Sequence, residues 1–208
     1  MDMREHWEEV YRTRRVDETS WFQPHARLSV EMILAAVPNR DTPIIDVGGG
    51  ASMLVDDLLE EGYRDLTVLD LARSALDALR ARLGPKAHHV SFVEGDVRSV
   101  PLPAASVGLW HDRAVFHFLT DPEDRWRYLK QVRRCVVPGG WLLVATFAED
   151  GPSRCSGLDV VRYGPSRLHA AFGSEFELVE SRREDHRTPA GATQPFTYCL
   201  CRFDPSQG

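Results

Sequence analysis

The sequence predicts an α/β fold built on an open, mostly parallel β-sheet with helices on both faces. Through residue 150, short apolar runs alternate with amphipathic segments, and a glycine run directly follows the first apolar run. Short uninterrupted apolar strands are typical of parallel strands buried on both faces. Two long runs near the end of the chain are expected to pair antiparallel as a closing hairpin.

The elements are expected in a regular order. Two helices, around residues 3 to 13 and 26 to 37, precede the sheet. The alternating part then consists of PIIDV (43 to 47) with a helix from about Ser52, LTVLD (66 to 70) with SALDALRARL, VSFVEGD (90 to 96), and VGLWHD (107 to 112) with DPEDRWRYLKQVRRCV. Pro-Gly-Gly at 138 to 140 is expected to end that helix and turn into the strand WLLVATF (141 to 147).

We expect one domain over residues 1–208. A chain of 208 residues with 43% apolar residues can bury a single core without disulfides or a metal. An N-terminal helical cap covers 1–40, the core covers 41–150, and 151–208 forms a short helix and the closing hairpin of EFELVESRRED and QPFTYCLCRF.

Composition excludes several classes of protein. The net charge is -6 and no basic tail or stripe is present, so we expect no nucleic-acid partner. The start, MDMREHWEEVY, carries acids and no apolar run, and no later apolar stretch approaches a membrane span. We therefore expect a cytoplasmic protein without a membrane partner. The four cysteines show no CxxC spacing and no metal site is expected.

The stretch IIDVGGGAS indicates a ligand that approaches the backbone closely. Gly48, Gly49 and Gly50 form the turn after the first strand, where a doubly wound sheet binds its ligand. A pyrophosphate loop would have GxGxxG, but Met53 occupies the third position, and Asp46 precedes the glycines. An acid at that place suits a ligand that carries a cation.

Two further acids follow neighbouring strands. Asp70 closes the second strand, where a carboxylate can accept from both hydroxyls of a ribose. Asp96 closes the third, where it can accept from an exocyclic amine while the Val97 backbone donates to a ring nitrogen. Together with Asp46, these residues describe an adenosine with a cationic amino-acid tail.

The motifs DVGGGAS, VLD, EGDV and VVPGGWLLV, in this order and spacing, resemble those of class I S-adenosylmethionine-dependent methyltransferases. The resemblance covers nearly the whole chain. It implies a Rossmann-like seven-stranded sheet with a reversed last strand, an N-terminal cap over the cofactor, and S-adenosylmethionine as cofactor, with S-adenosylhomocysteine as product. The cofactor-binding residues that it implies are Asp46, Gly48, Gly49, Gly50, Asp70, Leu71, Asp96 and Val97, with Trp21 from the cap.

The acceptor is expected after the fourth strand and under the cap. Trp21 lies in TSWFQPH and can wall the sulfonium, since an aromatic face attracts a cation, although ordinary packing explains it equally well. His111 can pack beside the adenosine or take a proton. Arg113 can pair with Asp112 or orient an anionic or thiolate acceptor. The predicted catalytic set is His111, Asp112 and Arg113.

A narrower resemblance concerns LWHDRAVFHFLTDPEDRWRY, which is similar to the matching segment of thiopurine S-methyltransferases. That resemblance implies an arginine near the acceptor. The primary prediction is therefore methyl transfer to a small-molecule acceptor, plausibly a thiol or another soft nucleophile.

Several alternatives stay open. Protein-lysine methyltransferases share the WF cap and the aspartate after the fourth strand, but they carry Asp-Lys where this chain has Asp112 and Arg113. A cysteine site for arsenic at Cys155 would need more positioned cysteines. A non-catalytic cofactor-binding module is the rival from another class, because a fold alone does not establish chemistry.

Overall fold

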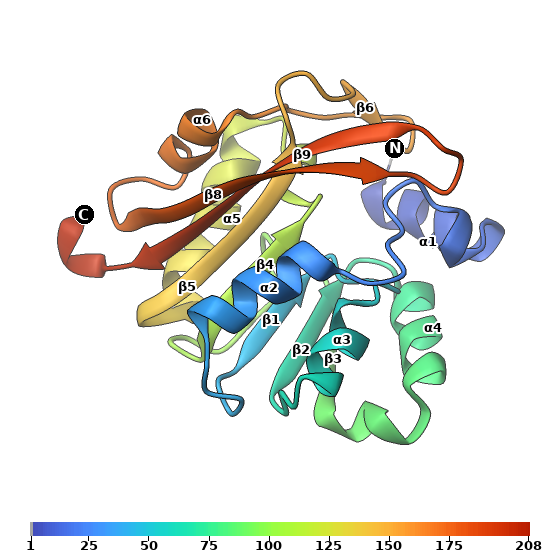
Figure 1. The fold of residues 1–208 in the computed structure, drawn as a ribbon, viewed down its shortest axis with the longest axis horizontal. Helices are drawn as coiled ribbons and strands as arrows, with labels where there is room; N and C mark the ends of the chain where they lie inside the picture. Colours follow the sequence, from blue (N-terminus) through green and yellow to red (C-terminus); the bar gives the residue numbers. More distant parts are fainter. Residues whose placement is uncertain (1) are drawn as a thin grey trace.

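The computed structural model describes residues 2–208, which form one seven-stranded sheet and a small hairpin (Figure 1). The strands of the sheet are β1 (Ile44–Val47), β2 (Leu66–Asp70), β3 (Val90–Glu94), β4 (Val107–Arg113), β5 (Val136–Phe147), β8 (Phe176–Arg187) and β9 (Thr193–Phe203). Their order is β3-β2-β1-β4-β5-β9-β8, and β9 is antiparallel to both of its neighbours. The mostly parallel sheet, its reversed last strand and the closing hairpin are therefore confirmed.

Helices cover both faces of this sheet. The helices are α1 (Met3–Thr13), α2 (Arg27–Ala36), α3 (Leu54–Glu60), α4 (Arg73–Leu83), α5 (Pro122–Cys135) and α6 (Pro165–Ala170), and four short 3₁₀ turns are η1 (Val16–Glu18), η2 (Gly84–His89), η3 (Phe116–Phe118) and η4 (Pro205–Gln207). In Figure 1, α2 crosses in front of the sheet, α5 lies behind it, and α1 lies beside α4. None of the helices within 2–208 has the length and apolar character needed to cross a membrane.

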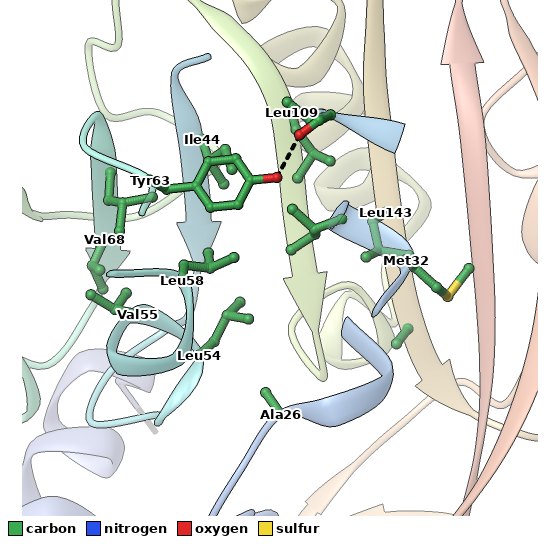
Figure 2. Close-up of a cluster of buried hydrophobic side chains, with 14 of the residues drawn as sticks. Ala26, Met32, Ile44, Leu54, Val55, Leu58, Tyr63, Val68, Leu109 and Leu143 are labelled. Carbon is green, nitrogen blue, oxygen red and sulfur yellow. Dashed lines mark hydrogen bonds between the residues drawn. The ribbon is translucent and has the colours of Figure 1, made fainter. Parts of the chain in front are cut away.

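One half of the core lies between the sheet and α2, α3 and α4. Met32 of α2, Leu58 of α3 and Leu109 of β4 are fully buried in it (Figure 2). Tyr63 also lies there, and its hydroxyl donates to the Val37 carbonyl at 2.5 Å. A buried hydroxyl without a partner would cost roughly 1 to 3 kcal/mol, so this bond fixes how the end of α2 meets the core.

The other half of the core lies between the sheet and α5 and α6. Trp110 of β4 and Tyr128 of α5 are fully buried there, and the indole Nε1 donates to the Tyr128 hydroxyl at 2.9 Å. Asp121 caps α5 by accepting from the Glu123 amide, and Pro122 occupies the first turn, where no amide donor is needed.

The prediction for the Pro-Gly-Gly segment was wrong in its position. Helix α5 ends at Cys135, and β5 starts at Val136, so Pro138 to Gly140 lie inside the strand rather than in a turn before it. The pairing of β5 with β4 is irregular at this place, and Gly139 has φ +73°. A left-handed glycine lets the strand bulge and continue, which a sequence pattern cannot distinguish from a turn.

Candidate functional site

Parallel strands bring the carboxyl ends of β1, β2, β3 and β4 to one edge of the sheet. There lies a cavity of about 290 Å³, close to the lower end of the range for small-molecule sites. It is lined from the strand ends by Val47, Gly48, Leu69, Asp70, Leu71, Gly95, Asp96, Val97 and Arg113, and from the cap by Met3, Trp7, Tyr11 and Trp21. Thus many of the predicted cofactor-binding residues line one cavity.

The glycine turn is packed too tightly for side chains. Gly48 has φ +65° and Gly50 φ +46°, both in the region that favours glycine. A Cβ on Gly48 would lie 2.0 Å from Val115, and one on Gly50 would lie 2.6 Å from the Tyr11 hydroxyl. The turn is therefore a cradle between the segment after β4 and helix α1.

Asp70 ends β2 inside the cavity wall. Its side chain is buried, and Oδ1 accepts from the Ala72 amide at 2.8 Å. Burial is the main cause, and together with the nearby carboxylates of Asp46 and Glu8 it raises the pKa of this carboxyl to about 7. Asp70 is thus a buried acceptor that a ligand with hydroxyl donors can satisfy.

Asp96 lines the same cavity but already has a strong partner. The Arg98 guanidinium donates to it from Nε at 2.9 Å, the Arg98 amide donates at 2.9 Å, and Arg98 also pairs with Asp124 at 2.6 Å. Burial raises the pKa of Asp96, but the hydrogen bonds from Arg98 outweigh it, so the net shift is downward. Asp96 is therefore held as an ionised acceptor.

Asp46 and His111 lie side by side on β1 and β4, below the glycine turn. His111 Nδ1 lies 2.7 Å from Asp46 Oδ1, and His111 Nε2 lies 2.9 Å from the hydroxyl of Ser29 on α2. Ser52 Oγ donates to Asp46 at 3.3 Å and accepts from the Leu54 amide at 3.4 Å. Asp46, His111 and Gly49 line a second, smaller cavity of about 60 Å³.

Asp112 lies on the opposite face of β4 and lines neither cavity. It is fully buried, accepts from the Tyr128 hydroxyl at 2.6 Å, and accepts from the amides of Val115 and Phe116 at 2.9 and 3.1 Å. Burial raises its pKa to about 6. Asp112 therefore holds the turn after β4, and among residues 2–208 it forms no ion pair with Arg113.

Arg113 faces the cavities and is held from several sides. Nε donates to the Tyr198 hydroxyl at 2.9 Å, one terminal nitrogen donates to the Trp21 carbonyl at 3.2 Å, and the other contacts Glu184 at 3.3 Å. The guanidinium carbon lies 4.2 Å from the centre of the Phe196 ring. Arg113 thus connects β4 to the cap and to the closing hairpin.

The cap contributes residues that the sequence analysis missed. Trp7 packs edge-on against Trp21 and Phe118, with distances of 5.6 and 5.3 Å between ring centres. Tyr11 packs against Trp21 with its ring centre 6.2 Å away. Met3, Trp7 and Tyr11 repeat every four residues on α1, which is the signal that could have found them. Cys155, on the hairpin of β6 (Arg154–Cys155) and β7 (Leu158–Asp159), also lines the cavity.

This arrangement fits the expected cofactor. The cavity offers a buried carboxyl at Asp70 for hydroxyl groups, a glycine cradle whose backbone a ligand can approach, and aromatic walls that suit a sulfonium cation. The adjoining small cavity offers Asp46. No cluster of three or more metal-binding side chains occurs in the described part of the chain.

Comparison with known proteins indicates a methyltransferase domain. A family model described as "Methyltransferase domain" matches residues 45–144. The chain is 23% identical to the eEF1A lysine and N-terminal methyltransferase of Bos taurus and 24% identical to that of Mus musculus, in each case over 98% of this chain. It spans 29% of the length of these relatives.

Solved structures show the same fold. The 1,6-didemethyltoxoflavin-N1-methyltransferase of Burkholderia thailandensis, solved with bound S-adenosylhomocysteine, has a TM-score of 0.74 at 22% identity, over 97% of this chain and 87% of that one. A structure described as "Conversion of a Disulfide Bond into a Thioacetal Group during Echinomycin Biosynthesis" has a TM-score of 0.76 at 16% identity, over 98% of this chain and 93% of that one.

Proposed function

We propose that this chain, a class I S-adenosylmethionine-dependent methyltransferase by its domain and fold, transfers the methyl group to an amine of a protein, with a lysine side chain as first candidate. One observation carries the proposal. The similarity to the lysine and N-terminal methyltransferases extends over 98% of this chain, so it includes the cap and the closing hairpin as well as the core. Those outer parts are the ones that an acceptor would meet.

The residues that would hold the cofactor follow from the two cavities. When bound, S-adenosylmethionine supplies a methyl group on a sulfonium. Asp70 would accept from the ribose hydroxyls, Asp96 and the Val97 backbone would bind the adenine, and Asp46 would accept from the ammonium of the tail. We propose that Leu71 and Trp21 also contact the cofactor, as apolar walls of the cavity.

The aromatic residues at the acceptor end suit an amine. Trp7, Trp21 and Phe118 surround the space next to Arg113 and Cys155, and aromatic faces attract ammonium and methylammonium groups. They also exclude water, which would compete as a nucleophile. Arg113 cannot accept a proton, so in this proposal it orients groups rather than acting as a base.

We propose that the other two residues of the predicted catalytic set act by positioning. His111 orients Asp46, to which it lies 2.7 Å away, and Asp112 fixes the turn that follows Arg113. The single domain over 1–208 and a cytoplasmic location remain predictions from the sequence.

Transfer of label to a protein tests this function. Methyl-tritiated S-adenosylmethionine is incubated with the chain and a cell lysate, and proteins are separated from small molecules. We expect enzyme-dependent counts in the protein fraction, located on lysine by peptide mass spectrometry, and lost with the Asp70→Ala variant. Counts confined to the small-molecule fraction would replace this proposal with the small soft-nucleophile acceptor that the sequence analysis favoured.

A further inference from the structure

We infer that Arg113 binds the carboxylate of the cofactor's methionine tail, across from Asp46, which takes the ammonium group of the same tail. The inference rests on the proposed function only for the identity of the cofactor. It does not depend on the acceptor, so the two can fail separately.

The first support is that the two cavities lie next to each other. Four residues line both of them: Tyr11, Trp21, Gly48 and Arg113. Because the proposed adenosine residues line the large cavity, a ligand that extended past Gly48 would reach the small one. Arg113 therefore stands where the nucleoside part of the cofactor would give way to its amino-acid tail.

The second support is the charge of the small cavity. Its only acidic lining residue within 2–208 is Asp46, and its only arginine is Arg113. A carboxylate and a guanidinium on one cavity of about 60 Å³ complement a small zwitterion, which presents one ammonium and one carboxylate. Asp46 is already oriented by His111 at 2.7 Å.

The third support is the set of donors that Arg113 still offers. A guanidinium has five N–H donors. Within the described chain three of them have acceptors, on Tyr198, Trp21 and Glu184, so one donor remains on each terminal nitrogen. Two donors on neighbouring nitrogens match the bidentate geometry by which arginine binds a carboxylate.

The fourth support is that Arg113 is held in place before any ligand arrives. Its side chain is only 10% exposed and lies over the Phe196 ring. Tyr198 also donates to Glu184 at 2.9 Å, which closes a hydrogen-bonded ring around the guanidinium. Little side-chain entropy is then lost on binding, which favours affinity.

A change in the ligand, paired with a change in the protein, tests the inference. Calorimetric titration compares S-adenosylhomocysteine with its decarboxylated analogue, S-adenosyl-3-thiopropylamine, on the full chain and on Arg113→Met. Methionine keeps an apolar stem over Phe196. We expect the wild type to prefer the carboxylate-bearing ligand by about 10- to 100-fold, the range for bonds to charged groups, and Arg113→Met to reduce that ratio to about threefold or less.

Arg98→Met is the matched control, because Arg98 is the other arginine lining the large cavity and lies at the proposed adenine end. It should weaken both ligands alike and leave their ratio unchanged. Equal binding of the two ligands by the wild type, or a ratio that survives in Arg113→Met, would overturn the inference. Failure to bind either ligand would instead refute the cofactor site. If Arg113→Met does not fold, Arg113→Lys serves in its place, with an intermediate ratio expected and an unchanged ratio contradicting the inference.

Discussion

At the scale of single residues, Asp70 has the environment most sensitive to a ligand. It is buried between the end of β2 and helix α1, and burial, with Asp46 and Glu8 nearby, raises its pKa to about 7. A ribose that donates two hydroxyls interacts better with the ionised carboxylate than with the neutral acid. Binding of the cofactor should therefore lower the pKa of Asp70 and release a proton near neutral pH.

This linkage predicts a pH-dependent affinity. Below pH 7 the ligand must displace a proton from Asp70, so S-adenosylhomocysteine should bind about tenfold more weakly at pH 6 than at pH 8, from a pKa of about 7. The Asp70→Asn variant should bind weakly at both values and show no such slope. Calorimetry in two buffers of different ionisation enthalpy measures both the affinity and the proton release, and an affinity independent of pH in the wild type would contradict the linkage.

Neighbouring residues of the fourth strand show what sequence reasoning can and cannot give. Asp112 and Arg113 are adjacent in sequence, and an ion pair between them was one of the two expectations for Arg113. Successive side chains of a strand point to opposite faces, so Arg113 faces the cavities while Asp112 faces Tyr128. The opposite directions of these two side chains can be predicted once the fourth strand is known to extend to Arg113. The partners Glu184 and Tyr198, about seventy or more positions away in sequence, were not predictable without the hairpin register.

At the scale of elements, helix α1 decides whether the cavity is covered. Glu8 joins α1 to the start of α4 by accepting from the amides of Arg73 and Ser74 at 2.5 and 3.3 Å. A carboxylate at a helix N-terminus is favoured by the amides and by the helix dipole. Arg4 makes a further contact with Glu94 at the end of β3. The cap is thus fastened to the same edge of the sheet that bears the proposed cofactor residues.

Removal of this fastening should open the cavity without unfolding the domain. For Glu8→Ala we expect faster hydrogen exchange at the first amides of α4 and about fivefold weaker binding of S-adenosylhomocysteine, equivalent to roughly 1 kcal/mol. Glu5→Ala is the control, since Glu5 is exposed on the same helix and makes no side-chain hydrogen bond within the described residues. Equal effects of the two substitutions would show that general helix destabilisation, rather than the Glu8 contact, governs the cap.

At the scale of the whole molecule, the order of motifs was enough to predict the sheet and the edge at which the cavity lies. Parallel strands bring Gly48, Asp70 and Asp96 to one edge whatever the details of packing. The bulge within β5 and the aromatic wall from α1 were not predicted, because both depend on tertiary packing that local patterns do not encode. The acceptor is the least predictable part, since the chain shares its fold with proteins of different chemistry.

In the proposed function, the cavity under α1 binds the methyl donor through Asp70. The most direct test is calorimetric titration of S-adenosylhomocysteine into the wild type, Asp70→Ala and Asp65→Ala at pH 8. Asp65 is an exposed acid just before the other end of β2, so it controls for charge and strand stability. We predict saturable binding by the wild type and Asp65→Ala, and a loss of about 10-fold or more in Asp70→Ala, the equivalent of one charge-assisted hydrogen bond. Equal affinity in all three proteins would contradict the claim.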